Sequence, residues 1–229
     1  MLQVFIMKNG IYLIKQSKIY YLYIIIRYDQ CNLAKYENGP AKWAFVKNIY
    51  NREYALRQFT RIKDSSQNNE SSFTFLRKIY VKESAIIDYQ FRASKTGFVS
   101  AIFKYKDCNN YYTFEMGGGD SMESRFFQVR KKVDGSFTLI KRFNTNDEIS
   151  YLPFFGYEVN TWYAVSIELK FDSIKIYVSL LGVTAKMIVF KLNDNTLKFG
   201  YVGFGTYGTE AAFSEIFIRP FPIPYGISL

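Results

Sequence analysis

The sequence predicts an all-β fold, either a sandwich or a barrel, and three observations carry this prediction. About a dozen short segments alternate apolar and polar residues, and clusters of Gly, Asn, Asp and Ser separate them as turns. Aromatic residues make up 19% of the chain, and they favour half-buried pleated surfaces. No segment has a long helical period. A chain of 229 residues that is 48% hydrophobic can build one sizeable core, so we expect one domain.

The expected strands follow one another at short intervals. In chain order they lie at residues 71–81, 84–94, 97–106, 110–116, 123–133, 135–143, 161–171, 173–181, 185–192, 197–207 and 211–221. The dipeptide Asp134-Gly135 is a strong signal for a β-hairpin. The last strand is expected to leave its sheet at Pro220, because proline cannot donate a ladder hydrogen bond.

Strand alternation divides residues 110–116 into two faces, one of which must enter the core. The two sets are Tyr112, Phe114 and Met116 on one face, and Tyr111, Thr113 and Glu115 on the other. Trp43 and Trp162 begin strands and are expected in the core or at its edge rather than as sugar platforms.

The two ends of the chain differ from the middle. Residues 1–38 are apolar, basic and poor in acids, and are expected to be a signal-like, anchor-like or irregular segment. Their longest uncharged run, residues 19–26, is too short to span a bilayer but suits the hydrophobic region of a secretory signal. The alternative is an edge strand. Residues 39–221 are expected to form the β-domain, and residues 222–229 a C-terminal tail.

Composition excludes several functions. The formal net charge is +10, but the basic residues are scattered, so a solvated lysine-rich surface is expected and no nucleic-acid partner, while association with a membrane surface stays open. The chain has no histidine, which excludes Ser-His-Asp and Cys-His nucleophiles and the usual zinc sites. Its two cysteines, Cys31 and Cys108, form either one disulfide or two free buried thiols. The sequon at Asn69 predicts a glycoprotein if the chain is secreted.

Four segments in order resemble a concanavalin A-like jelly roll of the laminin-G-like type. They are GFVSAIFKYKDCNNYYTFEM, RFFQVRKKVDGSFTLIKRF, NTWYAVSIELKFDSIKIYVSLLG and GYVGFGTYGTEAAFSEIFIRP. The resemblance covers about residues 97–220, and residues 39–94 would supply the opening strands. It implies an antiparallel β-sandwich, from a group whose members bind proteins, glycans or calcium, or hydrolyse glycans. Leu180 and Leu181 stand before Gly182 where related domains often carry an acid, so a rim site that needs that acid is not expected.

The turn after residues 97–106 is the candidate site. Its Asp and Asn residues suit a plain turn through local hydrogen bonds, and they also suit a cluster of ligands at the rim of the sandwich. On the second interpretation, the candidate calcium ligands are Asp107 and Asp120. The candidate ligand-binding residues, for a glycan or a protein, are Asn109, Asn110, Tyr112 and Tyr207.

These observations predict a non-enzymatic, lectin-like recognition or adhesion module, secreted or at a cell surface, that binds protein or glycan through its rim loops. One alternative is a glycan hydrolase, which needs two carboxylates roughly 5 to 10 Å apart. The nearest acid pairs, Glu168 with Asp172 and Glu210 with Glu215, lack a same-face spacing of two, so no enzyme is expected. The other alternative is a structural subunit whose basic surface meets an acidic partner.

Overall fold

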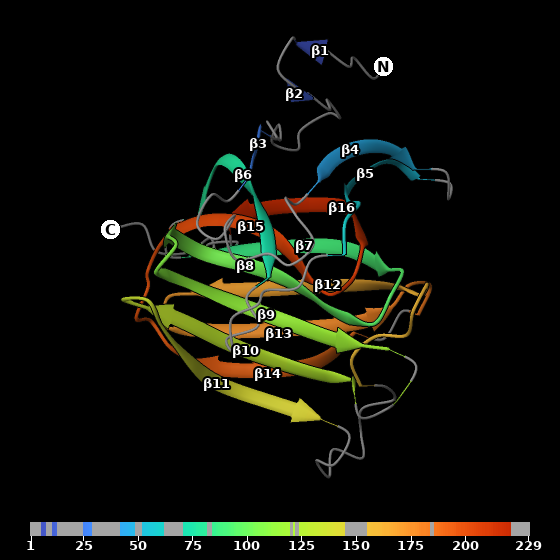
Figure 1. Ribbon diagram of the computed structural model, residues 1–229. Helices are drawn as coiled ribbons and strands as arrows, with labels where there is room; N and C mark the ends of the chain where they lie inside the picture. The colour runs from blue at the N-terminus through green and yellow to red at the C-terminus, as the bar shows by residue number, and fades with distance from the viewer. Residues whose placement is uncertain are drawn as a thin grey trace.

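Two seven-stranded antiparallel sheets stack face to face in this computed structural model. The structure describes residues 6–7, 11–12, 25–28, 42–48, 52–61, 71–81, 84–119, 121, 124–144, 155–183 and 186–220. The front sheet runs from edge to edge through β11 (Ser136–Asn144), β10 (Phe126–Val133), β9 (Asn110–Gly118), β8 (Gly97–Asp107), β15 (Gly200–Tyr207), β6 (Ser72–Val81) and β3 (Ile25–Tyr28). The back sheet runs through β14 (Met187–Asn193), β13 (Ser173–Leu180), β12 (Trp162–Lys170), β7 (Ser84–Ala93), β16 (Ala211–Pro220), β5 (Arg52–Gln58) and β4 (Trp43–Asn48). In Figure 1 the green and yellow strands β8 to β11 lie in front of the orange strands β12 to β14.

The all-β prediction is confirmed, and the fold is a jelly-roll β-sandwich whose two sheets do not close into a barrel. Every strand expected from residue 71 onward is present, and β4 and β5 open the back sheet. The hairpin between β10 and β11 turns at Asp134 and Gly135, whose φ angles of 48° and 81° are both positive. Two consecutive positive φ angles match the right-handed twist of the flanking strands. As expected, β16 ends at Pro220.

The N-terminal segment contributes to the sandwich. Within residues 1–38, β3 pairs with β6 at the edge of the front sheet, so the sheet takes in chain that precedes the expected boundary at residue 39. β1 (Ile6–Met7) and β2 (Ile11–Tyr12) pair with each other in a separate two-stranded sheet. A secretory signal in this segment stays a prediction. The described ranges contain no helix with the length and apolar character that a membrane crossing requires. The expected tail at 222–229 and the sequon at Asn69 lie outside the described residues.

The core lies between the sheets and is rich in aromatic rings. On β9, Tyr112, Phe114 and Met116 face inward and are almost fully buried, so the other set faces outward. Phe114 stacks with Phe127 of β10 at a centroid distance of 6.4 Å. Each buried Phe or Met side chain stabilises the fold by about 1.5–3 kcal/mol relative to exposure. The core thereby fixes which residues of β9 and β10 face away from it.

A polar network joins the two sheets at one end of the core. The Tyr112 hydroxyl of β9 donates to Asp194 Oδ1, which follows β14, at 2.5 Å, and Lys131 Nζ of β10 donates to Asp194 Oδ2 at 2.8 Å. Burial acts to raise the pKa of Asp194, but hydrogen bonds from Lys131, Tyr112 and Thr196 outweigh it, and the pKa lies well below its usual range. Asp194 therefore stays ionised as a link between the front and back sheets.

Candidate functional site

The outer face of the front sheet carries two neighbouring rows of side chains that cross four strands. One row is aromatic: β-sheet register aligns Phe126 of β10, Gly117 of β9, Phe98 of β8 and Tyr207 of β15. The other row is polar and lies two positions further along each strand, on the same face. In the same strand order, its residues are Gln128, Glu115, Ser100 and Gly205. The sheet therefore sets an apolar strip beside a hydrogen-bonding strip.

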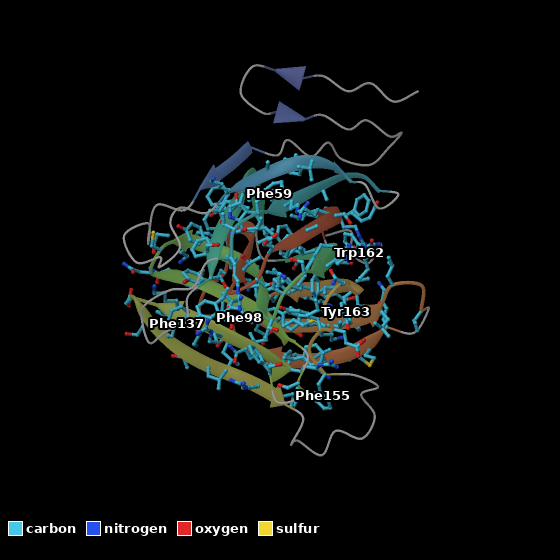
Figure 2. All side chains as sticks on the ribbon, turned by 45° about the vertical axis from the view of Figure 1, so that its right-hand side comes forward. Phe59, Phe98, Phe137, Phe155, Trp162 and Tyr163 are labelled. Atoms are coloured by element: carbon cyan, nitrogen blue, oxygen red, sulfur yellow. The ribbon has the colours of Figure 1, made fainter. Side chains whose placement is uncertain are left out.

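The aromatic row is closely packed. Phe98 stacks on Tyr207 with centroids 4.8 Å apart and an angle of 12°, and Phe126 lies 6.1 Å from Phe98. Gly117 makes this approach possible, since a Cβ atom there would lie only 2.2 Å from the Phe126 ring. The Phe126 ring thus lies across β9 where any other residue would displace it. Figure 2 labels Phe98 on the side of the sandwich formed by the front sheet, away from Trp162 on the back sheet.

Glu115 is the centre of the polar row. Its side chain is fully buried, and Oε1 accepts hydrogen bonds from Arg130 Nε at 2.9 Å and from Thr113 Oγ1 at 2.9 Å. Its Oε2 accepts a hydrogen bond from Gln128 Nε2. A buried carboxylate is tolerated only when it is paired and hydrogen-bonded, and each oxygen of Glu115 has a partner. Glu115 therefore orients the side chains of Arg130 and Gln128 rather than meeting solvent itself.

Two arginines from neighbouring strands stand over this row. Arg130 lies over the Phe137 ring, 4.6 Å from guanidinium carbon to centroid, and Arg142 of β11 lies over the Phe126 ring at 4.4 Å. Arg142 Nη1 also donates to Gln128 Oε1 at 3.4 Å. Stacking a guanidinium on an aromatic face holds it flat while its N–H groups point sideways. These contacts restrict the orientation of both guanidinium groups.

A groove of about 500 Å³ opens over both rows. Its lining residues are Thr96, Gly97, Phe98, Gly118, Ser124, Phe126, Gln128, Arg130, Leu139, Arg142 and Tyr207. Apolar walls with a few oriented polar groups are the usual makeup of a small-molecule site, and the volume lies within the usual range for one. The groove is the candidate functional site.

Of the residues that the sequence singled out for ligand binding, Tyr207 lines this groove. Asn109 and Asn110 lie in the turn at the far end of β8, whereas Tyr207 pairs with Phe98 at the beginning of that strand. An 11-residue strand separates its two ends by about 33 Å, at roughly 3.3 Å per residue. The structure therefore does not bring these residues together in one site.

Tyr112 requires a correction. It was expected at a ligand site, but its side chain is fully buried in the core. Its hydroxyl donates to Asp194 and accepts from the backbone N–H of Leu197 at 3.3 Å. Alternation places it on the face opposite to Glu115, so no part of Tyr112 is available to a ligand.

Asp107, Asn109 and Asn110 form a hydrogen-bonded turn. Asp107 Oδ1 accepts from the backbone N–H of Asn109 at 2.8 Å and from Asn110 Nδ2 at 2.9 Å. Asn110 Oδ1 accepts from the backbone N–H of Asp134 at 3.2 Å, and Asn109 O accepts from the backbone N–H of Gly135 at 3.1 Å. The turn thus joins the β8–β9 hairpin to the β10–β11 hairpin.

The side chains of this turn are engaged with one another, and calcium binding by Asp107 stays a prediction. Calcium takes six to eight oxygen ligands, and the carboxylate of Asp107 already accepts from Asn109 and Asn110. Within the described ranges no three His, Cys, Asp or Glu side chains gather closely enough to hold a metal ion. Asp120, the second candidate ligand, lies outside the described residues, and so calcium binding there stays a prediction.

The acid pairs considered for hydrolysis lie away from the groove. Glu168 accepts from the Tyr177 hydroxyl at 3.3 Å on the outer face of the back sheet. Glu210 lies 3.8 Å from Arg57 as an ion pair, and Glu215 sits at an irregularity of β16 with a φ of 48°.

Trp43 is buried and stacks on Phe213 in the core, as expected for a strand-opening tryptophan.

Cys108 is in a disulfide. The chain has one other cysteine, Cys31, which lies outside the described residues. Of the two alternatives that the sequence left open, the structure therefore favours the disulfide over free thiols.

Sequence reasoning missed the main residues of the groove: Phe98, Phe126, Gln128, Arg130 and Arg142. A signal was present, because Gln128 and Arg130 alternate with buried Phe127 and Val129, as Thr113 and Glu115 alternate with buried Tyr112 and Phe114. Two adjacent strands with polar residues on one face indicate a polar outer surface. The register between the strands, which aligns Glu115 with Gln128, depends on the intervening glycine loop and cannot be read from the sequence.

Comparisons with known proteins identify the fold. The structure is similar to the carbohydrate-binding module CBM66 from Bacillus subtilis, with a TM-score of 0.56 and 15% identity over 78% of this chain and 92% of that chain. It is also similar to the GH43 protein BlXynB from Bacillus licheniformis, with a TM-score of 0.53 and 12% identity over 79% of this chain and 35% of that chain. No protein-family model and no curated protein sequence matches this chain. The chain therefore has a jelly-roll β-sandwich of the concanavalin A-like type. Sequence identities this low support a conclusion about the fold alone.

Proposed function

We propose that this protein is a non-enzymatic carbohydrate-binding module that holds a glycan in the groove of the front sheet. The observation that carries the proposal is the aromatic row of Phe126, Phe98 and Tyr207 beside the polar row that Glu115 organises. A sugar ring has apolar C–H faces and a belt of hydroxyl groups, so it matches a site with those two kinds of surface side by side. The fold is shared with the carbohydrate-binding module CBM66 from Bacillus subtilis, which makes glycan recognition one of the functions that this fold supports.

Each group of the groove has a role in this proposal. The aromatic row of Phe126, Phe98 and Tyr207 supplies the apolar surface that meets the apolar face of the sugar. Arg142 and Arg130 donate N–H groups to hydroxyl or ring oxygens, and Gln128 does the same through its amide. Glu115, which is buried, positions Arg130 and Gln128 before the ligand arrives, and this reduces the entropy lost on binding.

The non-enzymatic part of the proposal rests on the carboxylates. Glycoside hydrolysis uses a pair of carboxylates that flank the scissile bond. Among the described residues that line the groove there is no Asp or Glu, and Glu115 beneath it has both oxygens engaged by Arg130, Thr113 and Gln128. Such a carboxylate is poorly placed to act as nucleophile or acid.

A secreted or surface location is part of the same proposal. A disulfide at Cys108 is stable in an oxidising compartment and is rare in the cytosol. The apolar, basic character of residues 1–38 suits an export signal.

The test is a screen of the full chain against oligosaccharides, followed by calorimetric titration of the best ligand. Phe126→Ala should weaken binding by at least about tenfold, which corresponds to 1.4 kcal/mol. Phe217→Ala is the matched control, since Phe217 is an exposed phenylalanine on the back sheet beside a second, smaller cavity of about 180 Å³. Equal affinity of the wild type and Phe126→Ala, with loss in Phe217→Ala, would move the site to the back sheet. Release of new reducing ends during incubation would overturn the non-enzymatic assignment.

A further inference from the structure

We propose that the groove selects an anionic sugar, one that carries a carboxylate or a sulfate group, and that Arg142 is the residue that recognises the anion. This inference rests on the proposed function and adds the ligand class to it. The observation behind it is an imbalance of charge between the groove and the residues beneath it.

The charged side chains that line the groove, among the described residues, are Arg130 and Arg142. One acid lies beneath them, Glu115, and it forms an ion pair with Arg130 at 2.5 Å. Both members of that pair are largely shielded from water, with side-chain exposures of 13% for Arg130 and 0% for Glu115. Arg130 is thereby neutralised by the protein itself.

For Arg142, no described residue supplies such a neutralising acid. Its contacts are the Phe126 ring and a long hydrogen bond to the Gln128 amide oxygen. No carboxylate lies within 4 Å of its guanidinium in the part of the chain that the structure describes. Two other described arginines differ: Arg125 pairs with Glu158 at 3.2 Å, and Arg219 pairs with Asp88 at 3.2 Å. Among the described residues that line the groove, Arg142 therefore presents a guanidinium without a paired carboxylate.

The chemistry of a guanidinium indicates what should complete this arrangement. A guanidinium is permanently charged and carries five N–H donors in a plane, of which Arg142 uses one on Gln128. Carboxylate and sulfate groups match that plane with two parallel hydrogen bonds, whereas a single hydroxyl uses one donor and leaves the charge uncompensated. Because Phe126 covers one face of the guanidinium, the anion would approach from the edge, beside the aromatic row that the sugar meets.

The neighbouring arginine strengthens the preference. Glu115 and Arg130 together are neutral, so they do not repel an incoming anion, and none of the described residues that line the groove is acidic. The net charge of +10 attracts anions to every face of the molecule, and a test must separate that general attraction from recognition by Arg142.

The experiment titrates the full chain with three oligosaccharides of equal length: one of neutral hexoses, one with terminal uronic acids and one with sulfated hexoses. The wild type should bind at least one of the two acidic ligands about tenfold or more tightly than the neutral ligand. Arg142→Gln should remove most of that difference, because it should lower affinity for the acidic ligand by a larger factor than affinity for the neutral ligand. Arg142→Lys keeps the charge but loses the planar set of donors, so its preference for the acidic ligand should lie between those of the wild type and Arg142→Gln. Arg219→Gln, on the back sheet, is the charge-matched control and should behave as the wild type.

The outcomes separate this inference from the function that it rests on. A preference for uronate or for sulfate that Arg142→Gln removes supports the proposal and identifies the anion. Neutral and acidic ligands bound equally well, with Phe126→Ala still weakening both, would overturn the anion preference and leave the carbohydrate-binding function standing. A preference for acidic ligands that Arg142→Gln and Arg219→Gln reduce equally would assign it to the general charge and overturn the role of Arg142. Binding that Phe126→Ala does not weaken would reject the groove as the site, and both proposals with it.

Discussion

Arg130 directs two donors at a single oxygen of Glu115: Nε lies 2.9 Å and Nη2 lies 2.5 Å from Oε1. The carboxylate is fully buried although it belongs to the outward face of β9. Its other partners, Thr113 and Gln128, come from the same face, so the four side chains form one hydrogen-bonded unit. An arginine held in this way has a restricted orientation, which reduces the entropy lost when a ligand binds beside it.

Removing the charge of Glu115 should destabilise the protein strongly. Glu115→Gln leaves Arg130 in a mostly buried place without its counter-ion, and breaking such a pair costs about 3–5 kcal/mol. Urea unfolding measures the loss. Glu158→Gln is the control, because Glu158 pairs with Arg125 but is 58% exposed, and an exposed pair is worth less than about 1 kcal/mol.

A double substitution distinguishes the charge from the shape of this site. Replacing both Glu115 and Arg130 by Leu removes both charges, so the double variant should lose less free energy of unfolding than Glu115→Leu alone. Equal losses for Glu115→Gln and Glu158→Gln would contradict a structural role for the buried pair.

Gly117 should prove necessary for the aromatic row. A Cβ atom at this position would lie 2.2 Å from the Phe126 ring, so Gly117→Ala must push the ring off β9. We expect a loss of about 1–3 kcal/mol in stability and weaker glycan binding. In a Phe126→Ala background the same change should be nearly neutral, because the obstructing ring is gone. Thermodynamic coupling between the two positions is the readout, and additive effects would show that they do not touch.

The strands of this fold could be predicted from the sequence because each one repeats a pattern that local physics fixes. Residues 110–116 illustrate this: alternation divides them into two faces, one of which had to enter the core, and the structure shows that it is the face of Tyr112, Phe114 and Met116. Asp134-Gly135 needs two positive φ angles, so the hairpin was visible in two letters. Such signals lie within a few residues of each other along the chain.

The candidate site could not be predicted in the same way, because its residues meet through strand register. Phe98 and Tyr207 are far apart in sequence and become neighbours only when β8 pairs with β15. The sequence directed attention instead to Asp107 and Asn109, whose side chains and backbone serve the turn itself. Tyr112 illustrates the remaining ambiguity, since a tyrosine suits both a core with a polar partner and a sugar site.

Tyr112→Phe tests the placement of that side chain. The substitution removes a hydroxyl that donates to Asp194 and accepts from Leu197 N, so stability should fall by about 1–2 kcal/mol in urea unfolding. Glycan affinity should stay within about twofold of the wild type, because the groove lies on the other face of β9. A large loss of affinity with unchanged stability would return Tyr112 to the binding site.

Acid should expose the contribution of Asp194. Its folded-state pKa lies well below the unfolded value of about 3.9, so the stabilisation is fully present above that value and is lost as the pH falls toward the folded pKa. At pH 7, Asp194→Asn should be less stable than the wild type by about 1–3 kcal/mol, since Lys131 and Tyr112 lose a charged acceptor. As the pH falls from about 5 to 2, the wild type should lose stability faster than Asp194→Asn, and the two curves of stability against pH should converge.

Urea unfolding across this range measures the difference, and the same series on Asp88→Asn corrects for the loss of one negative charge. A gap between wild type and Asp194→Asn that stays constant down to pH 2 would contradict an ionised link between the sheets. Convergence would assign part of the acid sensitivity of the sandwich to this single carboxylate.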